Sequence, residues 1–351
     1  MNLVLTCLAL DEDDPILSHV VGWTAMLAGK PGIGRITVIS PRVGRYSLPD
    51  NVRVRPIGRR NKFATLIAFY RVVFAELRRG VDCFFVFQGG PYPGLLLPVK
   101  LITGKPVYQW KAHPLVTRLE RFFARYCDTL LFTSTPYSFP IPLPNRRVVG
   151  QGIDVGLFRP LVAEPSEDII TVGRVAPVKH LEKMVDLLKR CNERFETSYR
   201  LNIYGPTLDM DSEYLEKLKN IIENKGLSSN IVFHGSVSRN ELPEILSRHK
   251  VFLHFAATAL DKTTVEAMAC GTVVLSDNPC VIWTFPEHLR ARLTLPSDDL
   301  DRQVDILRDV LDMEQSLRQK LSAELRDMVI REHNIETFFD KILVEMEAKC
   351  V

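Results

Sequence analysis

The sequence lacks both a long uninterrupted apolar run and a basic leader. A membrane-spanning helix needs about 18 or more consecutive apolar residues. The longest candidate, residues 83–102, is broken by Gln88-Gly-Gly-Pro and by Lys100. The first residues, MNLVLTCLALDEDD, carry no basic side chain and turn acidic after the apolar stretch. We therefore expect residues 1–10 to form a first strand rather than a signal peptide, and we expect no membrane span.

The cysteines contain no CxxC pair. Seven of them are scattered over positions 7, 83, 127, 191, 270, 280 and 350, several inside apolar runs. This spacing argues against a disulfide framework and against a zinc site, and it favours reduced, buried thiols in a cytosolic protein. Low-complexity segments are also absent, and 46% hydrophobic with 25% charged residues is a globular composition. A chain of 351 residues is long enough for two domains of ordinary size.

Acidic residues are scarce in the first half of the chain. Residues 1–150 contain 20 Lys and Arg against 9 Asp and Glu, a balance of +11, whereas the remainder balances at −8. A basic half indicates an anionic partner: nucleic acid, an anionic membrane surface or a phosphorylated acceptor. No interleaved aromatic and basic nucleic-acid motif is present, which favours the last two. Residues 63–79 form a basic amphipathic pattern that could lie on such a membrane, although such helices more often cover a sheet.

Strands and helices alternate along the whole chain. Strands are predicted at 1–10, 35–40, 52–56, 81–87, 106–110 and 129–133, and a second series at 169–173, 200–204, 231–234, 251–255 and 272–276. This alternation predicts α/β architecture with doubly wound sheets. Turn residues cluster at GQGIDVGLFRP, residues 150–160, so we divide the chain into domains 1–155 and 156–330. A terminal helix, 331–351, could pack back on the first domain. Two such tandem domains would leave a cleft at the carboxyl ends of their sheets, where ligands bind.

The segment 255–276 holds one candidate site. Its short helix is expected to end at Gly271, which takes a left-handed conformation cheaply, and Thr263 or Thr264 is the expected N-cap. Free backbone N–H groups at that end would attract phosphate, and Glu266 in the first turn could accept hydrogen bonds from a ribose diol. The same pattern fits an ordinary helix start with a dipole-stabilising glutamate.

A second candidate site is Thr171-Val-Gly-Arg-Val-Ala-Pro-Val-Lys179. Gly173 would allow a ligand to approach the backbone, and Arg174 and Lys179 could clamp a diphosphate, one as a planar fork and the other as a point charge. Two solvated loop cations are the commoner case for such a pair. However, this pair, Lys262 and the helix start near 263 would all lie at the carboxyl ends of strands in one domain.

The segments VGRVAPVK (172–179), IYGP (203–206), NIVFHGSV (230–237) and VEAMACGTVVLS (265–276) follow one another in a characteristic order and spacing. Over about residues 147–280 the chain resembles the donor domain of GT-B-fold retaining glycosyltransferases, family 4 (glycosyl transferases group 1). KAHPLVTRLERFFARYCDTLLFTSTPYSF followed by GQGIDVGLFRP is similar to that family's acceptor-domain exit and hinge. The resemblance implies two tandem Rossmann-like domains facing across a cleft. It also implies transfer of a sugar from a nucleotide-sugar donor to a glycan, lipid-linked or small-molecule acceptor.

The resemblance also implies roles for single residues. Arg174 and Lys179 would hold the donor diphosphate and neutralise the leaving group. His113 would reach the transferred sugar across the cleft, although a histidine before proline is equally often structural. Glu266 would bind the ribose, backbone groups at 262–264 the phosphate, and 204–205 with 234–237 the nucleobase. The full donor-binding set is Gly173, Tyr204, Gly205, His234, Val237, Asp261, Lys262, Thr263, Thr264 and Glu266.

Two positions depart from the family's pattern. The family usually has a second glutamate eight residues before Glu266, followed by Gly-Phe-Gly, but here Thr258 stands there and the turn reads Ala-Leu-Asp-Lys. Asp261 could take over a sugar hydroxyl, with Lys262 offsetting its repulsion of phosphate, so the donor sugar stays open. The glycine-rich acceptor loop after the first strand is replaced by LDEDDP, residues 10–15, which leaves the acceptor open.

These features predict a metal-independent transferase that retains anomeric configuration, in which cations and the helix start stabilise the leaving nucleoside diphosphate. Closure about residues 150–160 would exclude water. No metal site is expected, because Asp209-Met-Asp211 follows a Gly-Pro turn where we expect exposure. No cofactor is implied beyond a UDP- or GDP-linked sugar as co-substrate. The expected location is cytoplasmic, with peripheral contact to the inner face of a membrane, and the pathway is polysaccharide biosynthesis.

Other functions fit parts of the sequence. Thr258 is compatible with a nucleotide-sugar-binding module without transferase activity. A dinucleotide oxidoreductase would need G-x-G-x-x-G after a first strand, but the nearest match, Gly29-Lys-Pro-Gly-Ile-Gly34, precedes a strand instead. A GT-B epimerase or phosphorylase would need motifs that this sequence does not contain.

Overall fold

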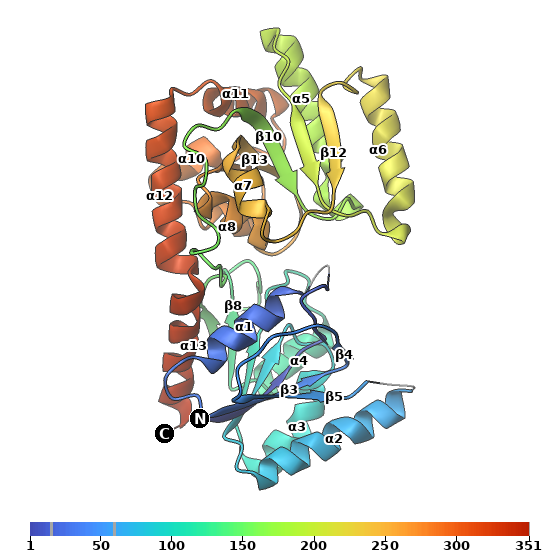
Figure 1. Cartoon of the computed structure of the whole chain (residues 1–351), viewed down its shortest axis with the longest axis vertical. Coiled ribbons are helices and arrows are strands. Elements are labelled where there is room, and N and C mark those ends of the chain that lie inside the picture. The colour runs from blue at the N-terminus through green and yellow to red at the C-terminus, as the bar shows by residue number, and fades with distance from the viewer. Residues whose placement is uncertain (15–16, 59–60, 351) are drawn as a thin grey trace. The chain divides into compact units, whose positions relative to one another are not determined.

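The computed structural model describes residues 1–14, 17–58 and 61–350, and it divides into two compact units (Figure 1). Unit 1 comprises Met1–Gly152 and Ile335–Val351, and unit 2 comprises Ile153–Asn334. The last helix of the chain, α13 (Ile335–Cys350), therefore belongs to the unit that contains the first strand. Pro15, the last residue of the acidic loop, lies outside the described residues.

Unit 1 is built on a parallel sheet with the strand order β5-β3-β1-β6-β7-β8-β9. Its inner strands are apolar and buried because helices cover both faces, whereas the edge strands β5 and β9 carry arginines and are partly exposed. The predicted strands are confirmed within a few residues. The first strand is the exception: it ends at Thr6, and Ala9–Leu10 (β2) pairs separately with Arg42–Val43 (β4). The main strands are β1 (Asn2–Thr6), β3 (Arg35–Ser40), β5 (Val52–Pro56), β6 (Cys83–Phe87), β7 (Val107–Trp110), β8 (Leu130–Thr133) and β9 (Arg146–Val148).

Helices α1 (His19–Ala28) and α2 (Lys62–Arg78) lie on opposite sides of this sheet (Figure 1). On the α1 side, Trp23 packs against Phe338 of α13 with a ring-centroid distance of 4.8 Å, and its indole N–H donates to the Gly152 carbonyl at 3.1 Å. On the α2 side, Phe69 packs with α3 (Tyr92–Thr103). Helix α4 (Arg118–Tyr126) follows β7. The two larger apolar clusters of unit 1 lie one on the α1 side and one on the α2 side, and a smaller cluster surrounds Leu131.

Unit 2 has a five-stranded parallel sheet with the order β12-β11-β10-β13-β14. Because all five strands run in one direction, the residues at their carboxyl ends share one edge of the sheet. The strands are β10 (Glu167–Val172), β11 (Leu201–Tyr204), β12 (Ile231–Gly235), β13 (His249–His254) and β14 (Val273–Ser276). Doubly wound α/β architecture, as predicted, is confirmed in both units.

The helices of unit 2 pack around this sheet on a single apolar cluster. The longer ones are α5 (Leu181–Phe195), α6 (Ser212–Asn224), α7 (Leu242–Ser247), α8 (Lys262–Ala269), α11 (Leu300–Leu311) and α12 (Gln315–His333). Short turns of helix are η1 (Pro177–Lys179), η2 (Asp209–Asp211), α9 (Pro279–Ile282), η3 (Glu287–Leu289) and α10 (Arg290–Leu293). Within the described residues, no helix has the length and apolarity needed to cross a membrane.

Candidate functional site

Two glycines bring the loops after β10 and β11 into close contact at the carboxyl edge of the unit 2 sheet. Gly173 and Gly205 have φ values of 153° and 139°, in the region that side chains rarely adopt. A Cβ added to Gly205 would lie 2.0 Å from the Gly173 carbonyl oxygen, so only glycine fits there. The Gly173 N–H donates to the Tyr204 carbonyl at 2.9 Å. The backbone at Gly173 is therefore fixed by its neighbouring strand.

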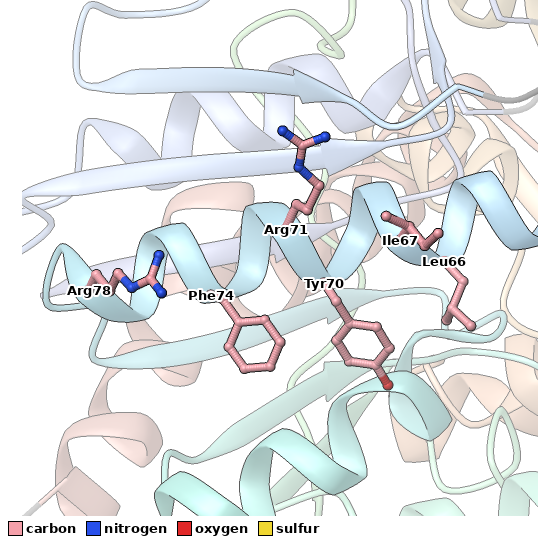
Figure 2. Close-up of a pocket in the computed structure, with 6 residues that line it drawn as sticks. All are labelled: Leu66, Ile67, Tyr70, Arg71, Phe74 and Arg78. Atoms are coloured by element: carbon pink, nitrogen blue, oxygen red, sulfur yellow. The ribbon is translucent and has the colours of Figure 1, made fainter.

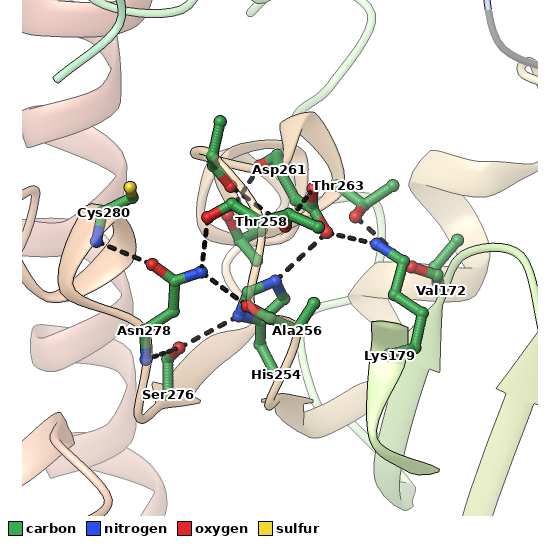
Figure 3. A network of polar contacts seen from close by, with 12 residues as sticks. Val172, Lys179, His254, Ala256, Thr258, Asp261, Thr263, Ser276, Asn278 and Cys280 are labelled. Carbon is green, nitrogen blue, oxygen red and sulfur yellow. Dashed lines mark hydrogen bonds and ion pairs between the residues drawn. The ribbon is translucent and has the colours of Figure 1, made fainter. Parts of the chain in front are cut away.

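Lys179 folds back over Gly173 and reaches Asp261. A Cβ on Gly173 would lie 3.1 Å from Lys179 Cε, and the Lys179 ammonium forms an ion pair with Asp261 Oδ2. Figure 3 shows Lys179 and His254 converging on this carboxylate, with His254 Nε2 3.1 Å from Oδ2. Thr258 Oγ1 donates to Oδ1 at 3.0 Å. The residue that replaces the family's glutamate therefore binds the carboxylate of Asp261.

Further hydrogen bonds hold the loop after β13 in place. His254 Nδ1 lies 3.0 Å from Ser276 Oγ, at the end of the adjacent strand β14 (Figure 3). The Asn278 side-chain amide donates to the carbonyl of Thr258 at 2.9 Å and also to that of Ala256. These contacts orient Asp261 by fixing the loop that carries it.

Asp261 is held as a carboxylate. Burial acts to raise its pKa, but the Lys179 ammonium and His254 outweigh that effect and bring the pKa of Asp261 well below its ordinary value. The positive charge of Lys179 is thus balanced by the carboxylate of Asp261, in the same unit. A ligand with more negative charge than one carboxylate, such as a diphosphate, could compete for this ammonium.

The start of α8 differs from the prediction. The helix begins at Lys262 with Asp261 as N-cap, so Thr263 and Thr264 lie inside the first turn. Within the described part of the chain, the Asp261 carboxylate makes no cap hydrogen bond, because Lys179, Thr258 and His254 engage it. The buried Thr264 hydroxyl donates instead to the Asp261 carbonyl at 2.7 Å. Thr263 Oγ1 donates to the Val172 carbonyl at 3.3 Å, which joins α8 to the end of β10.

Arg174 contacts an acidic residue that the sequence had placed in solvent. Its Nε lies 3.4 Å from Asp211 Oδ2, and the Asp211 side chain is only 6% exposed. The expectation that the Asp209-Met-Asp211 turn is exposed is therefore wrong for Asp211, because η2 turns this side chain inward toward the loop after β10. Arg174 and Lys179 each have an acidic partner of their own.

Glu266, which the sequence analysis suggested as a ribose-binding residue, is buried in the same region. Arg239, in the loop after β12, donates to its Oε1 at 3.3 Å and stacks on Phe158 at 4.9 Å. Burial raises the pKa of Glu266 despite the nearby positive charges of Arg239 and Lys262. Burial likewise brings the pKa of Lys262 well below its ordinary value. Glu266 is thus in a strongly desolvated setting with two cationic neighbours.

The proposed nucleobase residues form a stacked pair. The His234 ring lies on the Tyr204 ring with a centroid distance of 4.1 Å and an angle of 4° between planes. His234 Nε2 is 2.8 Å from Asn202 Oδ1, which fixes the ring orientation. His234 is exposed and Tyr204 is buried beneath it, while Val237 packs on the core of unit 2.

His113 lies in unit 1, in the exposed loop after β7. Its Nδ1 accepts a hydrogen bond from the Leu115 backbone N–H at 3.2 Å, which sets the ring within its own loop. The neighbouring Lys111 is buried and forms an ion pair with Glu120. Glu120 and Thr117 form a capping box at the start of α4. The loop that carries His113 is therefore anchored at both ends.

The sequence analysis did not identify Arg239 and His254 as site residues, and it expected Asp211 to be exposed. His254 did carry a signal, because it is a polar residue at the carboxyl end of a buried apolar strand. Asp211, in η2, and Arg239, in the loop after β12, are far from their partners in sequence, so no local pattern marks them. Across the described residues, no three His, Cys, Asp or Glu side chains gather as ligands for a metal ion.

Comparison with known proteins finds a family match within unit 2. Residues 157–328 match the family of glycosyl transferases group 1. The chain is 29% identical over 132 residues to a mouse GDP-Man:Man(3)GlcNAc(2)-PP-Dol alpha-1,2-mannosyltransferase, covering 36% of this chain and 27% of that protein. It is 22% identical over 189 residues to a Mycobacterium tuberculosis GDP-mannose-dependent alpha-(1-6)-phosphatidylinositol monomannoside mannosyltransferase, covering 48% of each. The match thus spans half or less of the length of these curated relatives.

Solved structures show the same fold over nearly the whole chain. Anabaena HepE, crystallised with UDP and glucose, superposes with a TM-score of 0.78 at 15% identity, covering 99% of this chain and 100% of that one. Sucrose-phosphate synthase from Thermosynechococcus elongatus gives a TM-score of 0.77 at 15% identity, covering 99% of each chain. At such identities the likeness concerns the fold alone. The chain therefore has the GT-B fold, and residues 157–328, which lie within unit 2, match the glycosyl transferases group 1.

Proposed function

We propose that the protein transfers a sugar from a UDP- or GDP-linked donor to a glycan or lipid-linked acceptor, with retention of anomeric configuration and without a metal ion. The observation that carries the proposal is the position of Lys179. Its ammonium lies over the Gly173 backbone and beside the first turn of α8. A lysine, a helix N-terminus and an open backbone are the groups that bind a diphosphate.

In this proposal the Asp261 carboxylate pairs with the Lys179 ammonium until the donor binds. The donor diphosphate carries more negative charge than one carboxylate and takes over the Lys179 ammonium, while Arg174 turns from Asp211 to the second phosphate. Charge on the leaving nucleoside diphosphate is then stabilised by fixed cations and by backbone N–H groups at 262–263. Each well-placed donor of this kind contributes about 3–4 kcal/mol to the barrier reduction. The two cations make a metal ion unnecessary.

The remaining donor contacts are proposed as follows. The freed Asp261 carboxylate, held by Thr258 and His254, would accept from a sugar hydroxyl. Glu266 would bind the ribose and the Tyr204–His234 pair would border the base. His113 is proposed to meet the transferred sugar from unit 1. The mouse and mycobacterial relatives are named for GDP-mannose and the HepE structure contains UDP and glucose, which supports both donor classes.

The acceptor and location are proposed from charge and thiols. The two mannosyltransferase relatives are named for dolichol-linked and phosphatidylinositol acceptors, and the basic first half of this chain suits such an anionic lipid acceptor. Buried free cysteines suit a reducing compartment. We therefore place the enzyme in the cytoplasm, peripheral to the inner face of a membrane and active in glycan assembly.

The test is a thermal-shift screen of UDP-, GDP- and ADP-sugars on the wild type, Arg174→Ala, Lys179→Ala and the exposed control Lys217→Ala. The cognate donor should stabilise the wild type and the control but neither site variant. With that donor, transfer to lipid extracts should persist in EDTA, fall about 100-fold or more in Lys179→Ala, and give a product with the donor's anomeric configuration by NMR. Binding without turnover would instead indicate a nucleotide-sugar-binding module, and loss in EDTA would refute metal independence.

A further inference from the structure

Helix α2 exposes an apolar stripe on the side away from the sheet. Its buried side presents Phe69 and Val73 to the core. On the outer side Phe63, Ile67 and Phe74 remain 72%, 47% and 49% exposed. With Tyr70, these residues follow one another at spacings of four, three and four, so they lie on one face of the helix. A soluble helix that only covers a sheet would carry polar residues there.

The stripe borders an open groove of about 530 Å³ that runs along α2 (Figure 2). Leu66, Ile67, Tyr70 and Phe74 form its apolar part, and Arg71 and Arg78 form its charged part. Figure 2 shows the Tyr70 and Phe74 rings on one side of the helix and Arg71 reaching out from another side. The Tyr70 hydroxyl donates to the Leu95 carbonyl of α3 at 2.9 Å, and the last turn of α3 exposes Leu101 and Ile102. Helix α3, which Tyr70 contacts, thus adds two exposed apolar side chains at its last turn.

All exposed charges of α2 are positive. Lys62, Arg71 and Arg78 are exposed, while the single acidic residue of the helix, Glu76, is buried and pairs with Arg79 at 2.7 Å and with Arg35 at 3.5 Å. Helix α3 has no acidic residue in its sequence. A surface with an apolar stripe and exclusively basic flanks is complementary to an anionic bilayer, in which apolar side chains enter the acyl boundary and cations meet the headgroups.

A second copy of the chain fits this surface less well. Pairing two α2 stripes would bring Arg71 and Arg78 of both copies together without an acidic residue on the exposed face of either helix, and such like-charge contacts are unfavourable. We propose that the α2 stripe, with the last turn of α3, docks the protein on an anionic lipid bilayer. This surface would hold the enzyme at the membrane-peripheral position proposed above. Membrane docking rests on the proposed function only for its biological role, because binding to a bilayer requires no nucleotide sugar.

The test is co-flotation of the full chain, without nucleotide sugar, with vesicles of phosphatidylcholine alone or mixed with phosphatidylglycerol. The wild type should bind the anionic vesicles and be released by salt, which screens the headgroups. Each basic residue at an anionic surface strengthens binding about fivefold, so Arg71→Glu/Arg78→Glu should weaken it by about 30-fold or more. Ile67→Ser/Phe74→Ser should weaken it at least about tenfold through lost apolar burial.

Matched controls lie on α12 of unit 2. Leu317→Ser removes an exposed apolar residue, and Lys320→Glu/Arg331→Glu changes the net charge as much as the α2 charge variant does; both should bind like the wild type. Equal melting temperatures of all variants would show that the fold is intact. Wild-type binding that is independent of phosphatidylglycerol, or α2 variants that bind like the controls, would overturn the proposal. Self-association or nucleic-acid binding through α2 in place of vesicle binding would overturn it as well. Transfer to a soluble acceptor tests the enzymatic proposal separately.

Discussion

Replacing Gly205 by alanine should break the contact on which the donor site is built. An added Cβ would lie 2.0 Å from the Gly173 carbonyl oxygen and 2.6 Å from its carbonyl carbon, whereas real Cβ atoms stay beyond 3.0 Å. The Gly173 loop must therefore move by about 1 Å. Because both contacting atoms belong to the backbone, a side-chain rotation cannot relieve the clash. Arg174, the next residue, moves with this loop.

The loss of folding free energy in Gly205→Ala has two parts. A residue with a side chain at a φ of 139° is strained by about 1–3 kcal/mol. The displaced loop also weakens the hydrogen bonds from Gly173 N–H to Tyr204 and from Gly205 N–H to Gly235, at about 1 kcal/mol each. We expect a total near 3–5 kcal/mol. In a domain of this size that lowers the melting temperature by about 6–20 °C, and a 1 Å misplacement of site groups lowers transfer about 100-fold.

The matched control is Gly226→Ala, in the turn after α6. Gly226 has a φ of 69°, but an added Cβ would have no heavy atom within 4 Å, so the variant isolates the conformational cost of about 1–2 kcal/mol. Thermal unfolding and donor titration of both variants provide the comparison. Equal melting temperatures for Gly205→Ala and Gly226→Ala, together with wild-type donor affinity in Gly205→Ala, would contradict this prediction.

Two further variants or treatments test the electrostatics of unit 2 and the buried thiols. Burial raises the pKa of Glu266, so its contribution to folding is favourable below the ordinary glutamate pKa and is lost as pH rises through the raised value. Glu266→Gln should therefore unfold at a higher temperature than the wild type at pH 7 but not at pH 4, while binding the donor more weakly; a lower melting temperature at pH 7 would contradict this. Burial raises the pKa of Cys7, Cys127 and Cys270 to about 12, so a thiol reagent at pH 8 should modify them only after unfolding in guanidinium, and rapid labelling of the native protein would argue otherwise.

Much of the architecture could be predicted because it depends on short-range patterns. The apolar run that forms β6 and the alternation of strands with amphipathic helices specify elements that bury their own apolar faces, and these were confirmed. Gly271 ends α8 with a φ of 85°, as its sequence position predicts. The first strand was wrong beyond Thr6, because β2 pairs with β4 outside the main sheet.

Local sequence patterns were enough to predict the parallel α/β units and the family segment, which puts Gly173 directly after β10, Lys179 shortly after it and Glu266 in the helix that follows β13. Which charges meet at this edge of the sheet became visible only in the folded chain. Lys179 pairs with Asp261 across 82 positions of sequence, Arg174 pairs with a buried Asp211, and Arg239 covers Glu266. Backbone preferences and patterns of burial depend on residues that are close in sequence. An ion pair between distant residues depends instead on which loops the parallel sheet brings together at one edge.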